Sequence, residues 1–400
     1  MVFFLMNNPF TIVSFGLERW HTPWLNRQHI LSEMSRHVNV FYSNQERTIG
    51  DNQSTLQGRQ NISSSLYIHT PSMALPNFFN PLLLRLNPFM RRLRIQEIKQ
   101  ILQKKHWITP IVNYIWHPHF ADLLGELNEC VSVFHCHDYY PEFMQGKQSD
   151  VDPLIKNMEL ALNKADLVFV SSSAIGIKMQ EHVKREYTVI ENGVNFSLFH
   201  RGASLPLPAE LADIPHPIMG YIGRINCKID FKLLLAIARA RPDFSVLLMG
   251  PLAGELPSDL QAMFDTLRAL PNFFYIPEKS PADLPPYFNA IDVGIMPYRL
   301  ATWAQYGFPL KLFEYFAVGK PCVCSPLSSI KMYYPAVLFA LTLAEWLEAI
   351  DKALVEKDQK FSVERIKCAE KNTWAARVEQ IFSQIQKTIE YKKKQGQCIR

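Results

Sequence analysis

Short apolar runs alternate with helical patterns along the chain. Residues 11–15 (TIVSF), 38–42 (VNVFY) and 131–136 (VSVFHC) are apolar runs of strand length, and residues 27–36 (RQHILSEMSR) have the spacing of a helix. Near-continuous apolar runs of this length suit parallel strands that are covered on both faces. The alternation therefore predicts an α/β protein with doubly wound parallel sheets.

A proline-rich segment, residues 201–217 (RGASLPLPAELADIPHP), interrupts this alternation. Such segments commonly separate domains. We therefore expect one Rossmann-like domain over residues 1–200, a linker over 201–217 and a second Rossmann-like domain over 218–371. Residues 372–400 have a helical pattern with a basic end, and we expect this helix to pack back toward the first domain. Ligand chemistry is expected where the strands end, in a cleft between the domains.

The composition agrees with a globular protein of about two domains. The chain has 400 residues, of which 48% are hydrophobic and 20% charged, and its net charge is +5. This mild positive excess gives no reason to expect a nucleic-acid partner.

The cysteines and the apolar runs bear on the compartment. The seven cysteines are odd in number and scattered, which argues against a disulfide framework and for a reducing compartment. No apolar run reaches the roughly 18 residues that cross a bilayer, and the opening MVFFLM lacks the basic residues of a signal peptide. We expect a cytoplasmic protein, either soluble or peripheral on the inner face of the cell membrane.

Residues 80–107 form a basic segment with seven Lys or Arg side chains against one acid. Apolar side chains are interleaved with these charges, so the segment could lie on an anionic membrane surface through Arg91, Arg92 and Arg94. The alternative is an ordinary basic helix in solvent.

Residues 309–318 carry two charges within an otherwise apolar helical pattern. Pro309 suits the first turn of a helix and Gly319 its carboxyl end. Lys311 would add its charge to a helix N-terminus, which attracts anions, and Glu314 one turn later could accept hydrogen bonds from hydroxyls. The pair could recognise the adjacent phosphate and sugar diol of a nucleotide. The alternative is an i,i+3 ion pair, which contributes only a few tenths of a kcal/mol.

Two other strand ends in the second half carry basic or polar residues. In GYIGRINCK (220–228) glycines end a strand and place Arg224 at its edge, and MPYR (296–299) ends a later strand. Together with Lys311 they predict a site for a nucleotide diphosphate at the carboxyl edge of the second sheet.

The segments NGVNFSLF, GYIGRI, FSVLLMGP, LPPYFNAIDVGIMPYR and PLKLFEYFAVGKPCV occur in the order and spacing of GT-B glycosyltransferases. The chain resembles family-4-like enzymes and bacterial polysaccharide enzymes of the xanthan glucuronosyltransferase type, over most of its second half and part of its first. The resemblance implies two Rossmann-like domains facing a cleft, an acceptor-binding one first and a nucleotide-sugar-binding one second. It implies a hexosyl- or glycuronosyltransferase of cell-envelope or exopolysaccharide synthesis, with a lipid-linked or polysaccharide acceptor. It implies no metal or other cofactor, and family habit favours a UDP-sugar as donor.

The resemblance assigns donor-binding roles to charged residues of the second domain. Arg224 and Lys311 would hold the donor diphosphate, and Lys228 is a weaker candidate because its spacing from Arg224 is short. Glu314 would bind the ribose.

The resemblance also assigns two less direct roles and shows one departure. Ile276 would contact the base through its backbone, and Tyr298 would lie near the phosphates. Many family-4 members have a glutamate eight residues before the ribose-binding one, where this chain has Tyr306. That acid normally approaches the donor sugar, so the sugar and the stereochemical outcome stay open.

In the first half, VFHCHDYYPEF (133–143) follows an expected strand. By position Asp138 matches the aspartate proposed as general base in the xanthan-type enzymes, and His137 is the second candidate. An aspartate after a strand can instead be a helix cap or turn former. Trp20 and Trp24 follow the first strand and could stack on sugar or lipid of the acceptor, or pack in the core.

Two other functions stay open. The H-x-H pairs His117/His119 and His135/His137 could ligate zinc in a metal-dependent hydrolase. A non-catalytic protein that binds nucleotide sugars would carry the same donor site without turnover.

Overall fold

The computed structural model divides the chain into two compact units. The first consists of Met1–Ile190 with Arg377–Arg400, and the second of Glu191–Ala376. The structure describes residues 10–17, 19–20, 24–44, 47–48, 60–61, 63–71, 74–75, 87–107, 110–143, 148–201, 205–252, 254, 256–300, 303–356 and 358–398.

The first unit is built on one twisted sheet in the order β10-β9-β8-β7-β1-β2-β5-β4. Its strands are β1 (Thr11–Phe15), β2 (Asn39–Ser43), β4 (Gln60–Asn61), β5 (Leu66–His69), β7 (Ile111–Ile115), β8 (Val131–Cys136), β9 (Leu167–Val170) and β10 (Thr188–Val189). All neighbours are parallel except β4, which is antiparallel to β5. The short strands β3 (Arg47–Thr48) and β6 (Ala74–Leu75) form a separate pair. Every residue of β1 and β8 is buried, as expected for strands covered on both faces.

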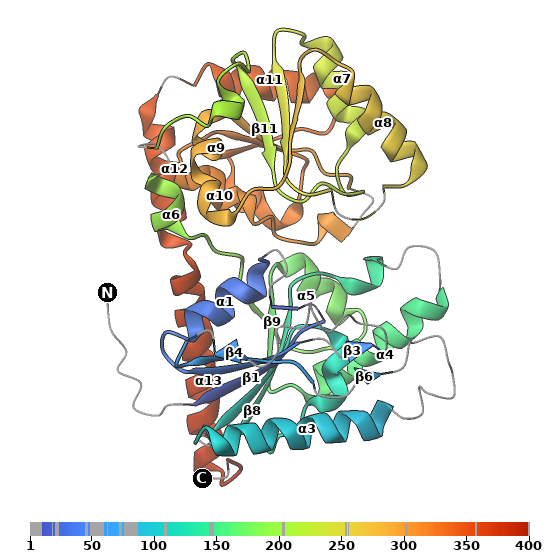
Figure 1. Ribbon diagram of the computed structural model, residues 1–400, viewed down its shortest axis with the longest axis vertical. Coiled ribbons are helices and arrows are strands. Elements are labelled where there is room, and N and C mark those ends of the chain that lie inside the picture. The colour runs from blue at the N-terminus through green and yellow to red at the C-terminus, as the bar shows by residue number, and fades with distance from the viewer. Residues whose placement is uncertain are drawn as a thin grey trace. The chain divides into compact units, whose positions relative to one another are not determined.

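Helices cover this sheet (Figure 1). They are α1 (Asn26–Met34), α3 (Asn87–Lys104), α4 (Gln148–Lys164), α5 (Ser173–Gln180) and the part of α13 (Trp374–Lys394) from Arg377 onward, with 3-10 turns η2 (Pro118–Leu123) and η3 (Tyr140–Phe143). The Phe382 ring of α13 packs edge-on against Phe10, with centroids 5.3 Å apart. Residues after 376 are therefore part of the first unit's core.

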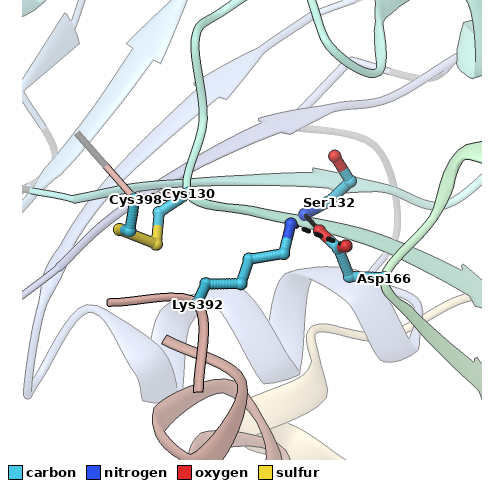
Figure 2. The surroundings of a disulfide bond; sticks show 5 residues. All are labelled: Cys130, Ser132, Asp166, Lys392 and Cys398. Atoms are coloured by element: carbon cyan, nitrogen blue, oxygen red, sulfur yellow. Dashed lines mark hydrogen bonds and ion pairs between the residues drawn. A yellow bond between two sulfur atoms is a disulfide. The ribbon is translucent and has the colours of Figure 1, made fainter. Parts of the chain in front are cut away.

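The end of α13 is fastened to the first sheet by a disulfide between Cys130 and Cys398, which are 268 residues apart in the sequence (Figure 2). Beside it Lys392 lies 2.7 Å from Asp166, whose other carboxylate oxygen accepts a hydrogen bond from the Ser132 amide (Figure 2). The odd, scattered cysteines argue against disulfides, and for this pair that prediction is wrong. The fold brings together two cysteines whose positions in the sequence gave no sign of pairing.

The second unit contains a fully parallel sheet in the order β13-β12-β11-β14-β15-β16. Its strands are β11 (Ile218–Ile222), β12 (Ser245–Met249), β13 (Phe273–Ile276), β14 (Val293–Met296), β15 (Cys322–Cys324) and β16 (Val337–Phe339). The buried side chains of these strands and of the covering helices form one continuous hydrophobic core.

Helices lie on both faces of this second sheet (Figure 1). On one side are α7 (Phe231–Ala240), α8 (Ser258–Arg268) and α11 (Leu343–Leu354). On the other are α6 (Phe196–His200), α9 (Pro285–Ala290), α10 (Lys311–Ala317) and α12 (Gln359–Lys371). The unit also contains the 3-10 turns η5 (Ala209–Leu211), η6 (Pro281–Asp283), η7 (Trp303–Gln305) and η8 (Ser328–Tyr333). The unit is therefore a doubly wound domain, as the alternation of patterns predicts.

The proline-rich segment 201–217 belongs to the second unit, and the structure divides the chain at Ile190 instead. Leu211 and Ile214 are buried in that unit's core. Glu210 accepts a hydrogen bond from the Tyr287 hydroxyl at 2.6 Å and pairs with Lys279. The prolines thus shape a packed extension of the domain. Residues 202–204 lie outside the described residues.

No helix within the described ranges is both long and apolar enough to span a bilayer.

Candidate functional site

The strand order of the second sheet creates a topological switch point. β11 lies between β12 and β14, so the loops after β11 and β14 leave toward opposite sides of the sheet. In open α/β sheets, ligands bind beside the carboxyl ends of the strands that flank such a point. Gly223 follows β11, Tyr298 lies two residues after β14, and Lys311 begins the next α-helix, α10.

Lys311 has a buried ammonium group at this point, although lysine is normally a surface residue. Its residue is 6% exposed, and its Nζ donates a hydrogen bond to the Tyr298 hydroxyl at 3.0 Å. The same Nζ lies 4.4 Å from the centroid of the Tyr221 ring. Burial lowers the pKa of Lys311, the nearby Lys228 charge lowers it further, and the Glu314 charge opposes both.

Gly223 makes room for this ammonium. Its φ is +146°, a conformation that L side chains rarely adopt, and a Cβ there would lie 3.1 Å from Lys311 Nζ. The glycines that the sequence places after the first strand of this domain therefore serve the site as well as the turn.

Glu314 lies on α10 beside Lys311 without pairing with it. No hydrogen bond or ion pair involves its carboxylate among the described residues, so the i,i+3 ion pair is not formed. Burial raises the pKa of Glu314, while the Lys311 charge lowers it. The site thus holds a buried cation and a half-buried acid that do not neutralise each other by direct contact.

The helix begins later than the sequence predicts. α10 starts at Lys311 and has seven residues, and Pro309 belongs to the preceding turn, where its carbonyl accepts the Leu312 amide at 3.3 Å. The predicted start at Pro309 is therefore two residues early, and the predicted anion site at this end of the helix stays a prediction.

The other predicted donor residues are spread along this edge. Arg224 is exposed on the turn after β11, and its carbonyl accepts a hydrogen bond from the Tyr221 hydroxyl at 2.9 Å. Lys228 Nζ lies 5.5 Å from the Tyr298 ring centroid. Ile276 ends β13, and its carbonyl already accepts the Gly250 amide at 3.0 Å. The structure therefore gathers Lys311, Lys228 and Tyr298, and leaves the Arg224 side chain toward solvent.

The first sheet has a switch point of its own, because β1 lies between β2 and β7. Trp116 follows β7, and its indole nitrogen donates to Ser14 Oγ of β1 at 2.9 Å. The Trp116 ring stacks on His135 with centroids 4.7 Å apart. An aromatic and polar cluster therefore fills this edge of the sheet.

His137 and Asp138 extend the cluster from the end of β8. The Tyr140 hydroxyl donates to the Trp116 carbonyl at 2.9 Å and lies 3.1 Å from His137 Nδ1. His137 Nε2 lies 3.7 Å from the Asp138 carboxylate, and the two side chains are 10% and 31% exposed. Burial holds the pKa of His137 well below its ordinary value, so its imidazole is neutral at neutral pH. The better exposed group at this edge is the Asp138 carboxylate.

The two H-x-H pairs are occupied by other contacts. His117 Nδ1 accepts the His119 amide at 3.0 Å, and His119 Nε2 lies 3.0 Å from an Arg91 guanidinium nitrogen. His135 Nδ1 lies 2.7 Å from the Tyr114 hydroxyl. Over the described residues, no three His, Cys, Asp or Glu side chains gather as metal ligands would.

The basic segment does not present all of its predicted membrane residues. Arg94 is 4% exposed, donates to Ser43 Oγ and to the Asn44 carbonyl, each at 2.8 Å, and lies over the Phe15 ring. Arg91 pairs with Asp122. Membrane contact through Arg94 is therefore wrong, because α3 turns this side chain into the core, and of the three arginines Arg91, Arg92 and Arg94 only Arg92 is exposed. The part of the segment before Asn87 lies outside the described residues.

Trp20 is also buried, at 3% exposure, and its amide donates to Asn44 Oδ1 at 2.8 Å. Its ring contacts Tyr42 and Trp24. An acceptor contact by the Trp20 ring does not agree with this position, whereas Trp24 is 40% exposed.

Two residues that the sequence reading does not single out belong to these edges. Tyr221 looks like an ordinary strand residue, yet its ring faces Lys311. Arg27 looks like the polar face of a helix, yet it is buried, bonds to the Tyr42 hydroxyl, and lowers the pKa of His137 through its charge. Tyr221 lies three residues before Arg224, and this position could have pointed to the site, whereas nothing in the sequence marked Arg27.

Part of the chain is similar in sequence to known proteins. Residues 216–355 match the family model described as Glycosyl transferases group 1. A protein of Bacillus subtilis (strain 168), named as the teichuronic acid biosynthesis glycosyltransferase TuaH, is 32% identical over 214 residues, which are 51% of this chain and 53% of that protein. The chain thus matches about half the length of that curated relative.

Solved structures cover nearly the whole chain. Sucrose-phosphate synthase from Thermosynechococcus elongatus is 15% identical, with a TM-score of 0.72 over 96% of this chain and 100% of its own. Anabaena HepE, solved in complex with UDP and glucose, is 15% identical, with a TM-score of 0.67 over 94% of this chain and 100% of its own. Likeness at these identities concerns the fold, and it confirms the predicted GT-B fold.

Proposed function

We propose that this protein moves a sugar from a UDP-sugar to a hydroxyl of a lipid-linked or polysaccharide acceptor, since residues 216–355 match the family model described as Glycosyl transferases group 1. The observation that carries the proposal is the buried ammonium of Lys311 at the switch point of the second sheet, beside a second cation, Lys228. Two neighbouring cations repel each other, and an anionic ligand such as a diphosphate removes that cost.

The donor binds in the second unit. Lys311 meets the diphosphate, Lys228 and the exposed Arg224 add positive charge, and Glu314 accepts hydrogen bonds from the ribose. When the bond between sugar and diphosphate breaks, negative charge grows on the leaving diphosphate, and the fixed ammonium stabilises it. The Glu314 carboxylate is suited to hydroxyl groups because none of its described neighbours bonds to it.

The acceptor hydroxyl is activated in the first unit. Asp138 takes its proton, since its carboxylate is partly exposed at the carboxyl edge of the sheet. His137 is the weaker base because its pKa is held far below neutrality by burial. Its imidazole and the Tyr140 hydroxyl instead keep the start of this loop in place.

The relatives indicate the substrate class. HepE was solved with UDP, which supports UDP over other nucleotides, and TuaH is named for the synthesis of a cell-wall polymer. We therefore assign this chain to the synthesis of an envelope or extracellular polysaccharide, with a glycan or lipid-linked glycan as acceptor.

A thermal-shift screen against UDP, GDP, ADP and dTDP tests the donor site. UDP is expected to raise the melting temperature most, and the shift is expected to disappear in Lys311→Ala. Incubation with UDP-sugars and a glycan acceptor then tests turnover. Binding of UDP without transfer to any acceptor would favour the non-catalytic alternative, and absence of any nucleotide-induced shift would contradict the donor site.

A further inference from the structure

Lys311 is held by two tyrosines that neither the sequence nor the comparisons assign to that task. We propose that Tyr298 and Tyr221 are positioning residues, which hold the Lys311 ammonium in place for the donor diphosphate and act on the donor only through it. The proposal rests on the proposed role of Lys311 as a diphosphate ligand.

Tyr298 and Tyr221 connect the ammonium to the turn after β11. Lys311 Nζ can only donate, so the Tyr298 oxygen accepts a hydrogen bond from it at 3.0 Å. Tyr221 interacts electrostatically with Tyr298, and its own hydroxyl donates to the Arg224 carbonyl at 2.9 Å. The two tyrosines therefore link the ammonium to the backbone of that turn.

The Tyr221 ring contributes separately from its hydroxyl. The ammonium lies 4.4 Å from the ring centroid, which is within the roughly 6 Å range of cation–π attraction. The Tyr298 ring stands nearly perpendicular to the Tyr221 ring, at 88°, with centroids 6.3 Å apart. The two rings thus form two walls of the ammonium's pocket.

Both tyrosines are themselves fixed, and their contacts point to Lys311. Tyr221 lies within β11 and has no exposed surface, and the Tyr298 hydroxyl accepts the hydrogen bond of the Lys311 ammonium. The segment of Tyr298 and Arg299 pairs with residues 228–229, where the Arg299 amide donates to the Lys228 carbonyl at 2.8 Å. Fixed neighbours of this kind can determine where the charge of Lys311 stands.

The charge on Lys311 depends on these neighbours. Lys228 in the loop after β11 disfavours the cation, as burial does, whereas Glu314 on α10 and Cys324 on β15 favour it. A hydroxyl that accepts a hydrogen bond from the ammonium favours the cation as well. Removing the Tyr298 hydroxyl should therefore lower the pKa of Lys311. Since the diphosphate binds the cation, the affinity of such a variant for UDP should fall at a lower pH than in the wild type.

The test is calorimetric titration of the full chain with UDP between pH 6 and pH 9. Tyr298→Phe is expected to bind about tenfold more weakly at pH 8.5 and nearly normally at pH 6. Tyr221→Leu removes the aromatic ring, and this variant should also bind UDP more weakly at pH 8.5 and nearly normally at pH 6. Tyr287→Phe is the matched control, because this buried tyrosine of the same unit donates to Glu210 on the 205–217 segment, and its profile should follow the wild type. UDP changes its own protonation over this pH range in the same way for every variant, so differences between the variants come from the protein.

A second background separates positioning from folding and from direct contact. In Lys311→Arg the guanidinium stays charged over this range, so adding Tyr298→Phe should no longer change the pH dependence. A loss in Tyr298→Phe that is equal at every pH, or no loss at all, would overturn the proposal while leaving the donor site intact. Unchanged UDP affinity in Lys311→Ala would instead overturn the proposed function itself.

Discussion

The two units share one plan of a parallel sheet with a switch point, yet they place opposite chemistry there. The first presents neutral imidazoles, aromatic rings, the buried guanidinium of Arg27 and the accessible carboxylate of Asp138. The second presents the ammonium groups of Lys311 and Lys228 with the half-buried acid Glu314. The fold determines where a ligand can bind, and burial and charge determine which ligand it is. A cationic edge suits an anion, whereas an edge that presents an accessible carboxylate beside neutral imidazoles suits the removal of a proton.

The largest effect should come from the carboxylate of the first unit. Asp138→Asn is expected to lower the rate of sugar transfer about 10²- to 10⁴-fold, the usual contribution of a general base. UDP affinity should stay unchanged, because the proposed donor site lies in the other unit. Glu142→Gln, an acid four residues later, is the control and should transfer at the normal rate. Normal turnover by Asp138→Asn would contradict the proposal that the first unit removes the acceptor proton.

The next effect concerns the cationic edge. Lys311→Ala is expected to weaken UDP binding about 10- to 100-fold, since hydrogen bonds to charged groups contribute about 1.5–3 kcal/mol. Lys352→Ala on the exposed face of α11 should bind UDP normally in the same calorimetric titration. Equal affinities of the two variants would place the anion elsewhere.

The first unit should lose more stability than the second when the pH is lowered. Burial lowers the pKa of His117 and of His135 to about 3. The unfolded chain takes up these protons below about pH 6.5 and the folded unit does not, so stability is lost as pH falls from 6.5 toward 3. The loss at pH 5 should be about 1–2 kcal/mol per histidine.

In the second unit, burial raises the pKa of Glu314 to about 7, so the folded carboxyl takes up its proton before the unfolded chain does and stability rises as pH falls from 7 toward 4.5, while the lowered pKa of Lys311 acts mainly above pH 7. Hydrogen exchange at pH 7.5 and pH 5 should therefore show faster opening in peptides from β7 and β8 than in peptides from β11 and β14. Equal acceleration in both sets would contradict the assignment of neutral, buried imidazoles to the first unit alone.

The smallest effect tests whether the first unit also meets a membrane. Arg92→Ala should weaken binding to vesicles that contain anionic lipid by about 1 kcal/mol, the contribution of one basic side chain near such a surface. Arg36→Ala, at the end of α1 and 72% exposed, is the control. Sedimentation that does not distinguish Arg92→Ala from wild type would leave α3 as an ordinary basic helix.

The sequence predicts the regular parts of this molecule well. Apolar runs of strand length and helical spacing are local signals, and they place β1, β2, β8, β11 and β14 correctly. Lys311 could be predicted as well, because a lysine within an apolar pattern is locally anomalous.

What the sequence does not predict depends on long-range packing. Arg94 lies in a segment whose charges look equivalent, and only the partners Ser43 and Asn44, about fifty residues earlier, show that it is buried. The pairing of Cys130 with Cys398 and the burial of Leu211 are of the same kind. Arg27 and Tyr221 gain their importance from neighbours on other elements, His137 after β8 and Lys311 on α10.

The two-part composition of the first unit affects how the polypeptide folds during synthesis. Domains usually fold in order as they leave the ribosome, the earlier one first. Here the earlier unit lacks α13 until residue 394 has been made, whereas the second unit is one uninterrupted stretch that ends at Ala376. The later unit can therefore acquire its native core first, and until then the surface around Phe10 that the Phe382 ring covers stays open, a period in which chaperone binding would have most to protect.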